Sequence, residues 1–218
     1  MIRIAPSILS ADFAALAQAI DGIAADADWL HVDVMDGHFV PNLTIGPPVV
    51  KSLRAHTSMY LDCHLMITNP ERYLEAFAKA GANGCSVHVE VGGTAELITQ
   101  MRGLGLDVGL AVNPDTPFED YEAFLPDLDL LLLMTVFPGF GGQAFLDEVV
   151  PKIRRTADAI EALGLDLPIQ VDGGIDERTA PVVAQAGASI FVAGSAIFGS
   201  TSPADAARRL REAGTRAA

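Results

Sequence analysis

The chain has 218 residues, of which 50% are hydrophobic and 19% charged, and this composition fits one compact domain better than a linker, a coiled coil or a disordered chain. Its 28 Asp and Glu against 14 Lys and Arg give a formal net charge of -14, which makes nucleic acid or an anionic membrane surface an unfavourable main partner. A local pocket for one small anion stays compatible with that charge.

Cysteine usage and hydropathy indicate a soluble protein of a reducing compartment. Cys63 and Cys85 are too few for a disulfide scaffold, and nothing at the N-terminus reads as a signal peptide. The longest strongly apolar run, residues 130–137, is far shorter than the roughly 20 residues that span a bilayer. We therefore expect a cytoplasmic location.

Eight short β-type runs alternate with stretches of helical spacing. The predicted strands are residues 2–8, 29–34, 59–65, 84–89, 107–112, 130–136, 168–171 and 189–192. The predicted helices are residues 13–25, 47–55, 70–80, 94–104, 118–125, 144–163, 178–186 and 203–213. The helix over 70–80 has the clearest signals, with Asn69 before it, Pro70 at its first position and Gly81 after it.

Alternating strands and helices predict a parallel sheet whose strands are buried on both faces. Eight units favour a closed (β/α)8 TIM barrel over residues 1–218 as a single domain, because closure removes both sheet edges. An open, doubly wound sheet is the alternative from the pattern alone.

In such a barrel the site lies at the carboxyl ends of the strands, so the side chains there carry the functional argument. The strand period of two puts several polar and methionine side chains on the inner side of the second, third and seventh strands. They are His31, Asp33, Met35, Asp62, His64, Met66 and Asp172.

Two imidazoles and two carboxylates among these residues suit one divalent Zn, Fe, Mn or Co ion. We therefore predict His31, Asp33, His64 and Asp172 as metal ligands. The competing interpretation is a hydrogen-bonded core histidine beside aspartates that cap turns. It is the weaker one for all four together, because inward carboxylates are costly without a cation.

Glycine-bearing turns follow the last three strands and predict a phosphate site, because glycine lets backbone N–H groups approach an anion. The residues concerned are Gly139, Phe140, Gly141, Gly142, Gly173, Gly174, Gly194 and Ser195. Each turn alone is equally well explained as a tight turn, and the three together are a stronger signal.

The remaining candidates have simpler interpretations. His88 and Glu90 share the inward phase, and we expect them to fill the barrel layer rather than to support a ligand. Ser7 either bonds substrate or caps a turn. Met35, Met66 and Met134 either wall the pocket around a reactive intermediate or fill the core.

Paired carboxylates on different strands allow proton removal from one face of a carbon and return to the other. A metal that chelates a carbonyl and the neighbouring hydroxyl would stabilise the enediolate between these steps, so the expected product is an epimer. The sequence carries no fingerprint of a nucleotide, a hydride carrier or another organic cofactor.

Several long motifs resemble the ribulose-phosphate 3-epimerase family. They cover residues 5–12, 31–42, 64–66, 138–143 and 171–175, and the resemblance runs from about residue 2 to about residue 200. It implies a TIM barrel that interconverts D-ribulose 5-phosphate and D-xylulose 5-phosphate with one divalent metal, in the pentose phosphate pathway and the Calvin cycle. It also implies a homo-oligomer with a sugar phosphate as its small-molecule partner.

Carried over by motif, the resemblance assigns the metal to His31, Asp33, His64 and Asp172, and the acid/base pair to Asp33 and Asp172. Ser7 and His64 would contact substrate, the glycine turns and Ser195 would surround its phosphate, and the methionines would line the reacting carbons. Phe137 departs from the family pattern, which has a polar residue there, and we expect it to alter the pocket rim or the loop packing.

Three alternatives stay open. An epimerase of a six-carbon ketose phosphate belongs to the same broad family. A phosphate-sugar lyase or decarboxylase would need a lysine that the stretch 62–67 lacks. A sugar-phosphate binding protein would explain the glycines but not the metal-type ligands.

Overall fold

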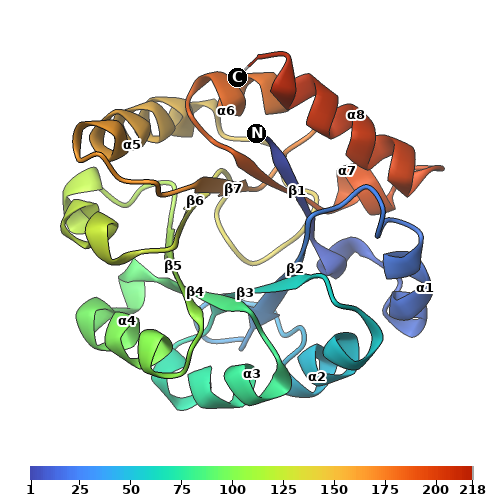
Figure 1. Cartoon of the computed structure of the whole chain (residues 1–218), viewed down its shortest axis with the longest axis horizontal. Helices are drawn as coiled ribbons and strands as arrows, with labels where there is room; N and C mark the ends of the chain where they lie inside the picture. Colours follow the sequence, from blue (N-terminus) through green and yellow to red (C-terminus); the bar gives the residue numbers. More distant parts are fainter. Residues whose placement is uncertain (218) are drawn as a thin grey trace.

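The computed structural model describes residues 1–217 and shows one ring of eight parallel strands with helices outside it (Figure 1). The strands are β1 Arg3–Pro6, β2 Trp29–Met35, β3 Tyr60–Met66, β4 Gly84–His88, β5 Asp107–Val112, β6 Leu130–Met134, β7 Ile169–Asp172 and β8 Ile190–Ala193. The predicted (β/α)8 barrel is confirmed, and the open sheet is excluded.

The ring is closed unevenly. Neighbouring strands from β2 round to β8, and β8 with β1, are joined by regular parallel ladders. Between β1 and β2 a single parallel bridge joins Ser7 to His31. This bridge lies just after the carboxyl end of β1 and joins it to the site residue His31 within β2.

Most helices are shorter than the sequence pattern predicts, whereas α2 and α8 extend slightly further than predicted. They are α1 Leu16–Asp21, α2 Pro47–His56, α3 Leu74–Ala80, α4 Thr94–Gly103, α5 Val150–Ala162, α6 Ala180–Gln185, α7 Ser195–Phe198 and α8 Pro203–Thr215. The α3 helix ends as predicted at Gly81, whose φ of 96° is the left-handed conformation that favours glycine. Its start was predicted too early, because Pro70–Arg72 forms a 3-10 turn and Asn69 makes no side-chain cap bond.

Two further helix predictions were wrong over part of their length. Residues 118–125 fall in the 3-10 helices Phe118–Asp120 and Glu122–Asp127, where Pro126 supplies no N–H for an α-helical bond. The segment before α5 is also not helical from residue 144, because the Leu146 N–H bonds the Thr135 carbonyl and holds that stretch against the end of β6.

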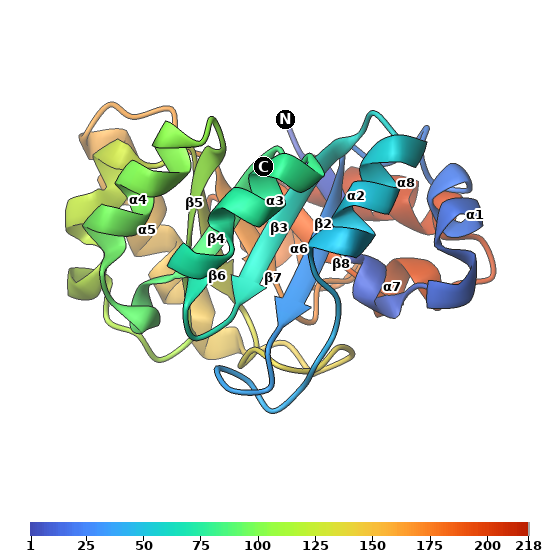
Figure 2. The ribbon, with the colours of Figure 1, turned by 90° about the horizontal axis from the view of Figure 1, so that it is seen from below.

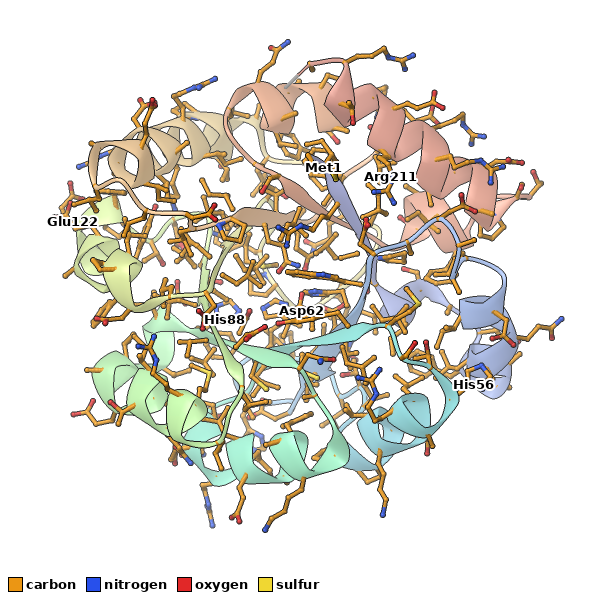
Figure 3. All side chains as sticks on the ribbon, viewed as in Figure 1. Met1, His56, Asp62, His88, Glu122 and Arg211 are labelled. Atoms are coloured by element: carbon orange, nitrogen blue, oxygen red, sulfur yellow. The ribbon has the colours of Figure 1, made fainter. Side chains whose placement is uncertain are left out.

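The core has two layers because alternate residues of each strand face opposite ways. Outward residues such as Val32, Val34, Cys63 and Cys85 pack in one large cluster beneath the helices. Inward residues form smaller clusters within the ring, where polar side chains such as Asp62 and His88 also lie (Figure 3). The outer layer therefore supplies most of the apolar packing of the barrel, and inner side chains at the mouth form the polar site.

The strands run toward one edge of the barrel, where the loops after β2 and β6 gather (Figure 2). Asn42 of the first loop donates a hydrogen bond of 3.1 Å to the Gly139 carbonyl of the second. Within residues 1–217, no helix has the length and apolarity needed to cross a membrane.

Candidate active site

Four side chains converge inside the mouth of the barrel. His31 and Asp33 come from β2, His64 from β3 and Asp172 from the end of β7. Each offers one ligand atom, and these atoms lie within 4.8 Å of one another. The period of two and the strand order thus bring together the set that the sequence singled out.

His31 is held by a residue beneath it. Its Nδ1 lies 2.8 Å from Oδ2 of Asp62, which also accepts a hydrogen bond of 2.7 Å from Gln170 Nε2. The proton of the His31 ring therefore sits on Nδ1, and the buried Nε2 has no hydrogen-bond partner. This Nε2 lies 3.3 Å from Asp33 Oδ1 and 3.9 Å from Asp172 Oδ2. The sequence analysis placed Asp62 on the inner side but gave it no role.

His64 faces the same centre with its other ring nitrogen. Its Nδ1 lies 3.3 Å from Asp33 Oδ1 and 3.8 Å from Asp172 Oδ2. Its Nε2 lies 2.8 Å from His88 Nε2, and His88 Nδ1 lies 2.9 Å from Glu90 Oε2. His88 and Glu90, which were expected to fill the barrel layer, are in addition bonded in series to His64.

Burial and mutual charge separate the two carboxyl groups. Burial, together with the negative charge of Asp33, raises the pKa of Asp172 to about 7. Burial opposes ionisation of Asp33 as well, but the His31 ring holds its pKa well below the usual range. Near neutral pH Asp33 is thus a carboxylate, while Asp172 lies close to its midpoint between acid and base.

The pKa values of the two imidazoles, His31 and His64, are also shifted in opposite directions. Burial would lower the pKa of His31, but the carboxylates of Asp33 and Asp62 raise it well above the ordinary value. Burial lowers the pKa of His64, so this ring is neutral. The centre of the cluster therefore attracts positive charge, as a proton or as a metal ion.

These residues fit a divalent metal ion. The Nε2 atom of His31 is buried without a hydrogen-bond partner and points at the two carboxyl groups, so a divalent ion would take the place of a proton on this nitrogen. Two imidazole nitrogens and two carboxylate oxygens are a donor set typical of Zn, Fe, Mn or Co, whereas Mg and Ca prefer oxygen alone.

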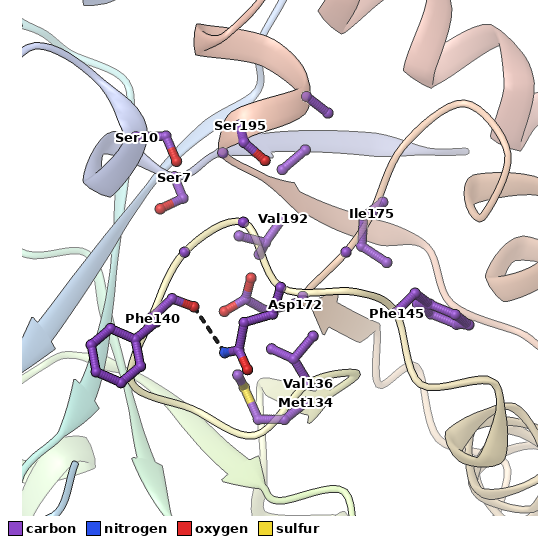
Figure 4. Close-up of a pocket in the computed structure, with 18 of the residues that line it drawn as sticks. Ser7, Ser10, Met134, Val136, Phe140, Phe145, Asp172, Ile175, Val192 and Ser195 are labelled. Atoms are coloured by element: carbon purple, nitrogen blue, oxygen red, sulfur yellow. Dashed lines mark hydrogen bonds between the residues drawn. The ribbon is translucent and has the colours of Figure 1, made fainter. Parts of the chain in front are cut away.

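A cavity of about 660 Å³ opens above the cluster (Figure 4). Asp33 and Asp172 reach it, while His31 and His64 lie beneath its floor and are fully buried. The predicted substrate and wall residues that line it are Ser7, Met35, Met66, Met134, Gly139, Phe140, Gly141, Gly142, Gly173, Gly174, Gly194 and Ser195. Its lining also contains Ser10 and Arg178, which the sequence analysis did not select.

The glycines after β7 are required by close packing. Gly173 has a φ of 119°, and a Cβ there would lie 2.4 Å from Val136 Cγ2. Gly174 has a φ of 64°, and a Cβ there would lie 2.5 Å from the backbone nitrogen of Phe145. Only glycine lets the β6–α5 loop approach the end of β7 this closely.

Ser7 and Phe137 take positions that sequence alone did not specify. The Ser7 hydroxyl donates to Asp33 Oδ2 at 2.5 Å and accepts from the Leu9 N–H at 3.3 Å, so it both orients a carboxylate and caps a turn. Phe137 is 49% exposed, and its carbonyl accepts a hydrogen bond of 2.7 Å from Gln143 Nε2. Its ring is not part of the cavity lining.

Comparison with known proteins decides the family. A family model described as the ribulose-phosphate 3 epimerase family matches residues 3–198. The chain belongs to the ribulose-phosphate 3-epimerase family.

Curated relatives agree with this assignment to the ribulose-phosphate 3-epimerase family. The ribulose-phosphate 3-epimerase of Bacillus subtilis (strain 168) is 50% identical over 217 residues, which covers 97% of this chain and 99% of the relative. The cytoplasmic isoform of Oryza sativa subsp. japonica is 50% identical over 217 residues, which covers 96% of this chain and 93% of the relative.

Solved structures share the fold at low sequence identity. A 3-hexulose-6-phosphate synthase superposes with a TM-score of 0.72 at 19% identity, over 97% of this chain and 99% of its own. The 3-keto-L-gulonate-6-phosphate decarboxylase of Vibrio cholerae gives 0.69 at 16% identity, over 99% and 98%. The lyase or decarboxylase alternative is set aside, because membership of the epimerase family rests on the much closer relatives.

Proposed function

We propose that this protein epimerises C3 of D-ribulose 5-phosphate to give D-xylulose 5-phosphate, and the reverse, with one divalent metal ion. The observation that carries the proposal is the pairing of Asp33 and Asp172, two carboxyl groups with opposite pKa shifts that meet at one cluster from β2 and β7. A relative with half its residues identical bears the name ribulose-phosphate 3-epimerase.

The two carboxyl groups divide the proton transfers. Asp33, held as a carboxylate, removes the C3 proton from one epimer, and Asp172 as the acid delivers a proton to the opposite face of C3. In the reverse direction they exchange roles. Because the two groups belong to strands on different sides of the pocket, the proton returns with inverted configuration.

The proposed metal ligands are His31, Asp33, His64 and Asp172. A divalent ion held there would stabilise negative charge on the substrate oxygens at C2 and C3 while the enediolate exists.

Other residues hold and shield the substrate. We assign Ser7 to contacts near the reacting carbons, and the backbone N–H groups around Gly173, Gly174, Gly194 and Ser195 to the phosphate. The substrate contact expected of His64 is not kept, because this ring lies beneath the cavity floor. Ser195 begins the short helix α7, beside the phosphate turn. Met35, Met66 and Met134 lie on the cavity wall at 5%, 1% and 2% exposure, and they would keep water from the enediolate.

The test is proton NMR of D-ribulose 5-phosphate with the purified protein in heavy water. We expect D-xylulose 5-phosphate to form with deuterium at C3, the reaction to stop when a chelator removes the metal, and a divalent ion to restore it. A folded, metal-loaded protein that gave no exchange at C3 would refute the pentulose assignment. A six-carbon ketose phosphate in a parallel sample tests the alternative substrate class. The cytoplasmic location, the homo-oligomer and the absence of an organic cofactor stay predictions.

A further inference from the structure

His64, His88 and Glu90 form a hydrogen-bonded chain of three side chains. It runs from the cluster of His31, Asp33, His64 and Asp172 to the end of β5. It passes from His64 Nε2 to His88 Nε2 at 2.8 Å and from His88 Nδ1 to Glu90 Oε2 at 2.9 Å. Glu90 Oε1 accepts hydrogen bonds from the Asn113 N–H at 2.7 Å and from the Thr116 hydroxyl at 2.5 Å. None of these contacts takes part in the proton transfers proposed above.

The chain fixes the position of each proton. The Glu90 carboxylate can only accept, so the proton of His88 resides on Nδ1. His88 Nε2 then offers a lone pair and must accept, so the proton of His64 resides on Nε2. His64 Nδ1 is left with a free lone pair, and this atom faces Asp33 and Asp172.

Packing holds the links of the chain in line. His64 and His88 are both fully buried, and their rings stack with centroids 5.0 Å apart. The Phe39 ring also packs against His88, with a centroid distance of 4.7 Å and an interplanar angle of 46°. Two donors that follow β5, the Asn113 N–H and the Thr116 hydroxyl, hold the Glu90 carboxylate, so the last acceptor of the series is also fixed.

The two histidines of the cluster thus have different supports. Asp62 bonds directly to His31, whereas the carboxylate that governs His64 acts through a second imidazole. We infer that His88 and Glu90 are positioning residues that fix His64 in the tautomer whose Nδ1 can bind a divalent metal ion. This inference rests on the metal site of the proposed function and adds two residues to it.

The first measurement is the affinity of the metal-free protein for Zn²⁺, by competition with a chromogenic chelator and without substrate. His88→Leu keeps the bulk but removes the acceptor, and we expect it to weaken Zn²⁺ binding by ~10- to 100-fold. Glu90→Ala should weaken binding in the same direction by less, because His88 keeps one of its two tautomers available. His88→Gln, whose amide oxygen can accept from His64, should recover most of the affinity.

A matched control lies on the same strand. Ser86 is buried, faces the barrel interior two residues before His88, and its hydroxyl has no hydrogen-bond partner. Ser86→Ala should leave Zn²⁺ affinity within a factor of about two of the wild type, since no bond to His64 is lost.

The second measurement is the ring tautomer itself, from long-range proton–nitrogen correlation spectra of metal-free protein labelled with ¹⁵N-histidine. The chain has only five histidines, so single substitutions assign every ring. We expect His64 in the wild type to be protonated on Nε2 alone, and a mixture of tautomers in His88→Leu and Glu90→Ala.

The outcomes separate this inference from the proposed function. Unchanged Zn²⁺ affinity and an unchanged His64 tautomer in both His88→Leu and Glu90→Ala would overturn the inference. If His88→Leu does not fold, Glu90→Ala and His88→Gln decide. A wild type that binds no Zn²⁺ would overturn the proposed metal site, and the tautomer spectra would still decide whether the chain positions His64.

Discussion

The Ser7 hydroxyl donates a 2.5 Å hydrogen bond to Oδ2 of Asp33 across the junction of β1 and β2. The other oxygen of Asp33 faces His31 and His64, at 3.3 Å from one ring nitrogen of each. The Ser7 bond therefore fixes one oxygen of the proposed base and directs the other oxygen toward the two imidazole nitrogens.

Removing the Ser7 hydroxyl should weaken catalysis without unfolding the barrel. A hydrogen bond to a charged group contributes ~1.5–3 kcal/mol, so we expect Ser7→Ala to lower kcat/KM by roughly 10- to 100-fold. Ser7→Thr keeps the hydroxyl and should retain more activity than Ser7→Ala. Steady-state kinetics on D-ribulose 5-phosphate checks this, and full activity in Ser7→Ala would show that Asp33 needs no such support.

Replacing Asp33 and replacing Asp172 should each remove a different one of the two proton transfers. Asp33→Asn and Asp172→Asn should each slow interconversion by ~100- to 10,000-fold, the contribution of a general acid or base. Each variant keeps one group, so each should still exchange the C3 proton of one epimer with solvent, and the epimer should differ between the two.

Deuterium uptake from pure D-ribulose 5-phosphate and from pure D-xylulose 5-phosphate measures this directly. Asp21→Asn is the control, because Asp21 lies on the surface, where Oδ1 contacts His56 Nε2. Wild-type interconversion in either active-site variant would remove the mechanism of two carboxylates.

Gly174 lies in the proposed phosphate turn after β7, and Gly105, before β5, is a matched control with a similar backbone conformation. Their φ angles are 64° and 73°, but a Cβ at Gly174 would lie 2.5 Å from the Phe145 nitrogen, whereas a Cβ at Gly105 would meet nothing within 4 Å. Gly105→Ala should cost about 1 kcal/mol of unfolding free energy from backbone strain alone. Gly174→Ala should cost roughly 3 kcal/mol and raise KM, because the β6–α5 loop must shift. Urea unfolding of both variants is the measurement, and equal losses would contradict the clash.

Asp36 should contribute stability that depends on pH. Its carboxylate accepts two hydrogen bonds from Thr68, at 2.7 and 2.8 Å, and one each from the His38 and Phe39 N–H groups at 2.8 Å. Partial burial opposes ionisation, but the Thr68 bonds lower the pKa of Asp36 well below its ordinary value of 3.8.

A lowered pKa in the folded state gives stability that is present above the unfolded value and lost as the pH falls below it. Asp36→Asn should therefore cost about 1–2 kcal/mol at pH 7, and the difference from the wild type should shrink below about pH 4. Urea unfolding at a series of pH values checks this, and a constant difference down to pH 3 would contradict it.

The sequence predicted the elements that depend on local pattern. The run Leu130–Met134 is a buried strand as expected, and the period of two placed His31 and Asp33 on the inner face. Helix starts were less predictable, because tertiary hydrogen bonds such as that of the Leu146 N–H compete with helical spacing.

The support of His64 could not be predicted from spacing. The register pairs His64 with Ser86, so His88 lies two residues further along β4, and only the folded barrel brings its Nε2 to 2.8 Å from His64. The inward phase of His88 and Glu90 was a usable signal, but phase does not specify which nitrogen of a ring meets which neighbour.

The single bridge between β1 and β2 has a consequence for how the protein is made. His31, Asp33 and His64 are synthesised early. Asp172 and strand β8, which pairs with β1 through a regular ladder, are synthesised much later. A nascent chain on the ribosome thus carries most of the cluster long before the fourth residue exists. Activity should arise only after Asp172 and β8 have been synthesised, and no fragment that ends before β8 should work as a smaller enzyme.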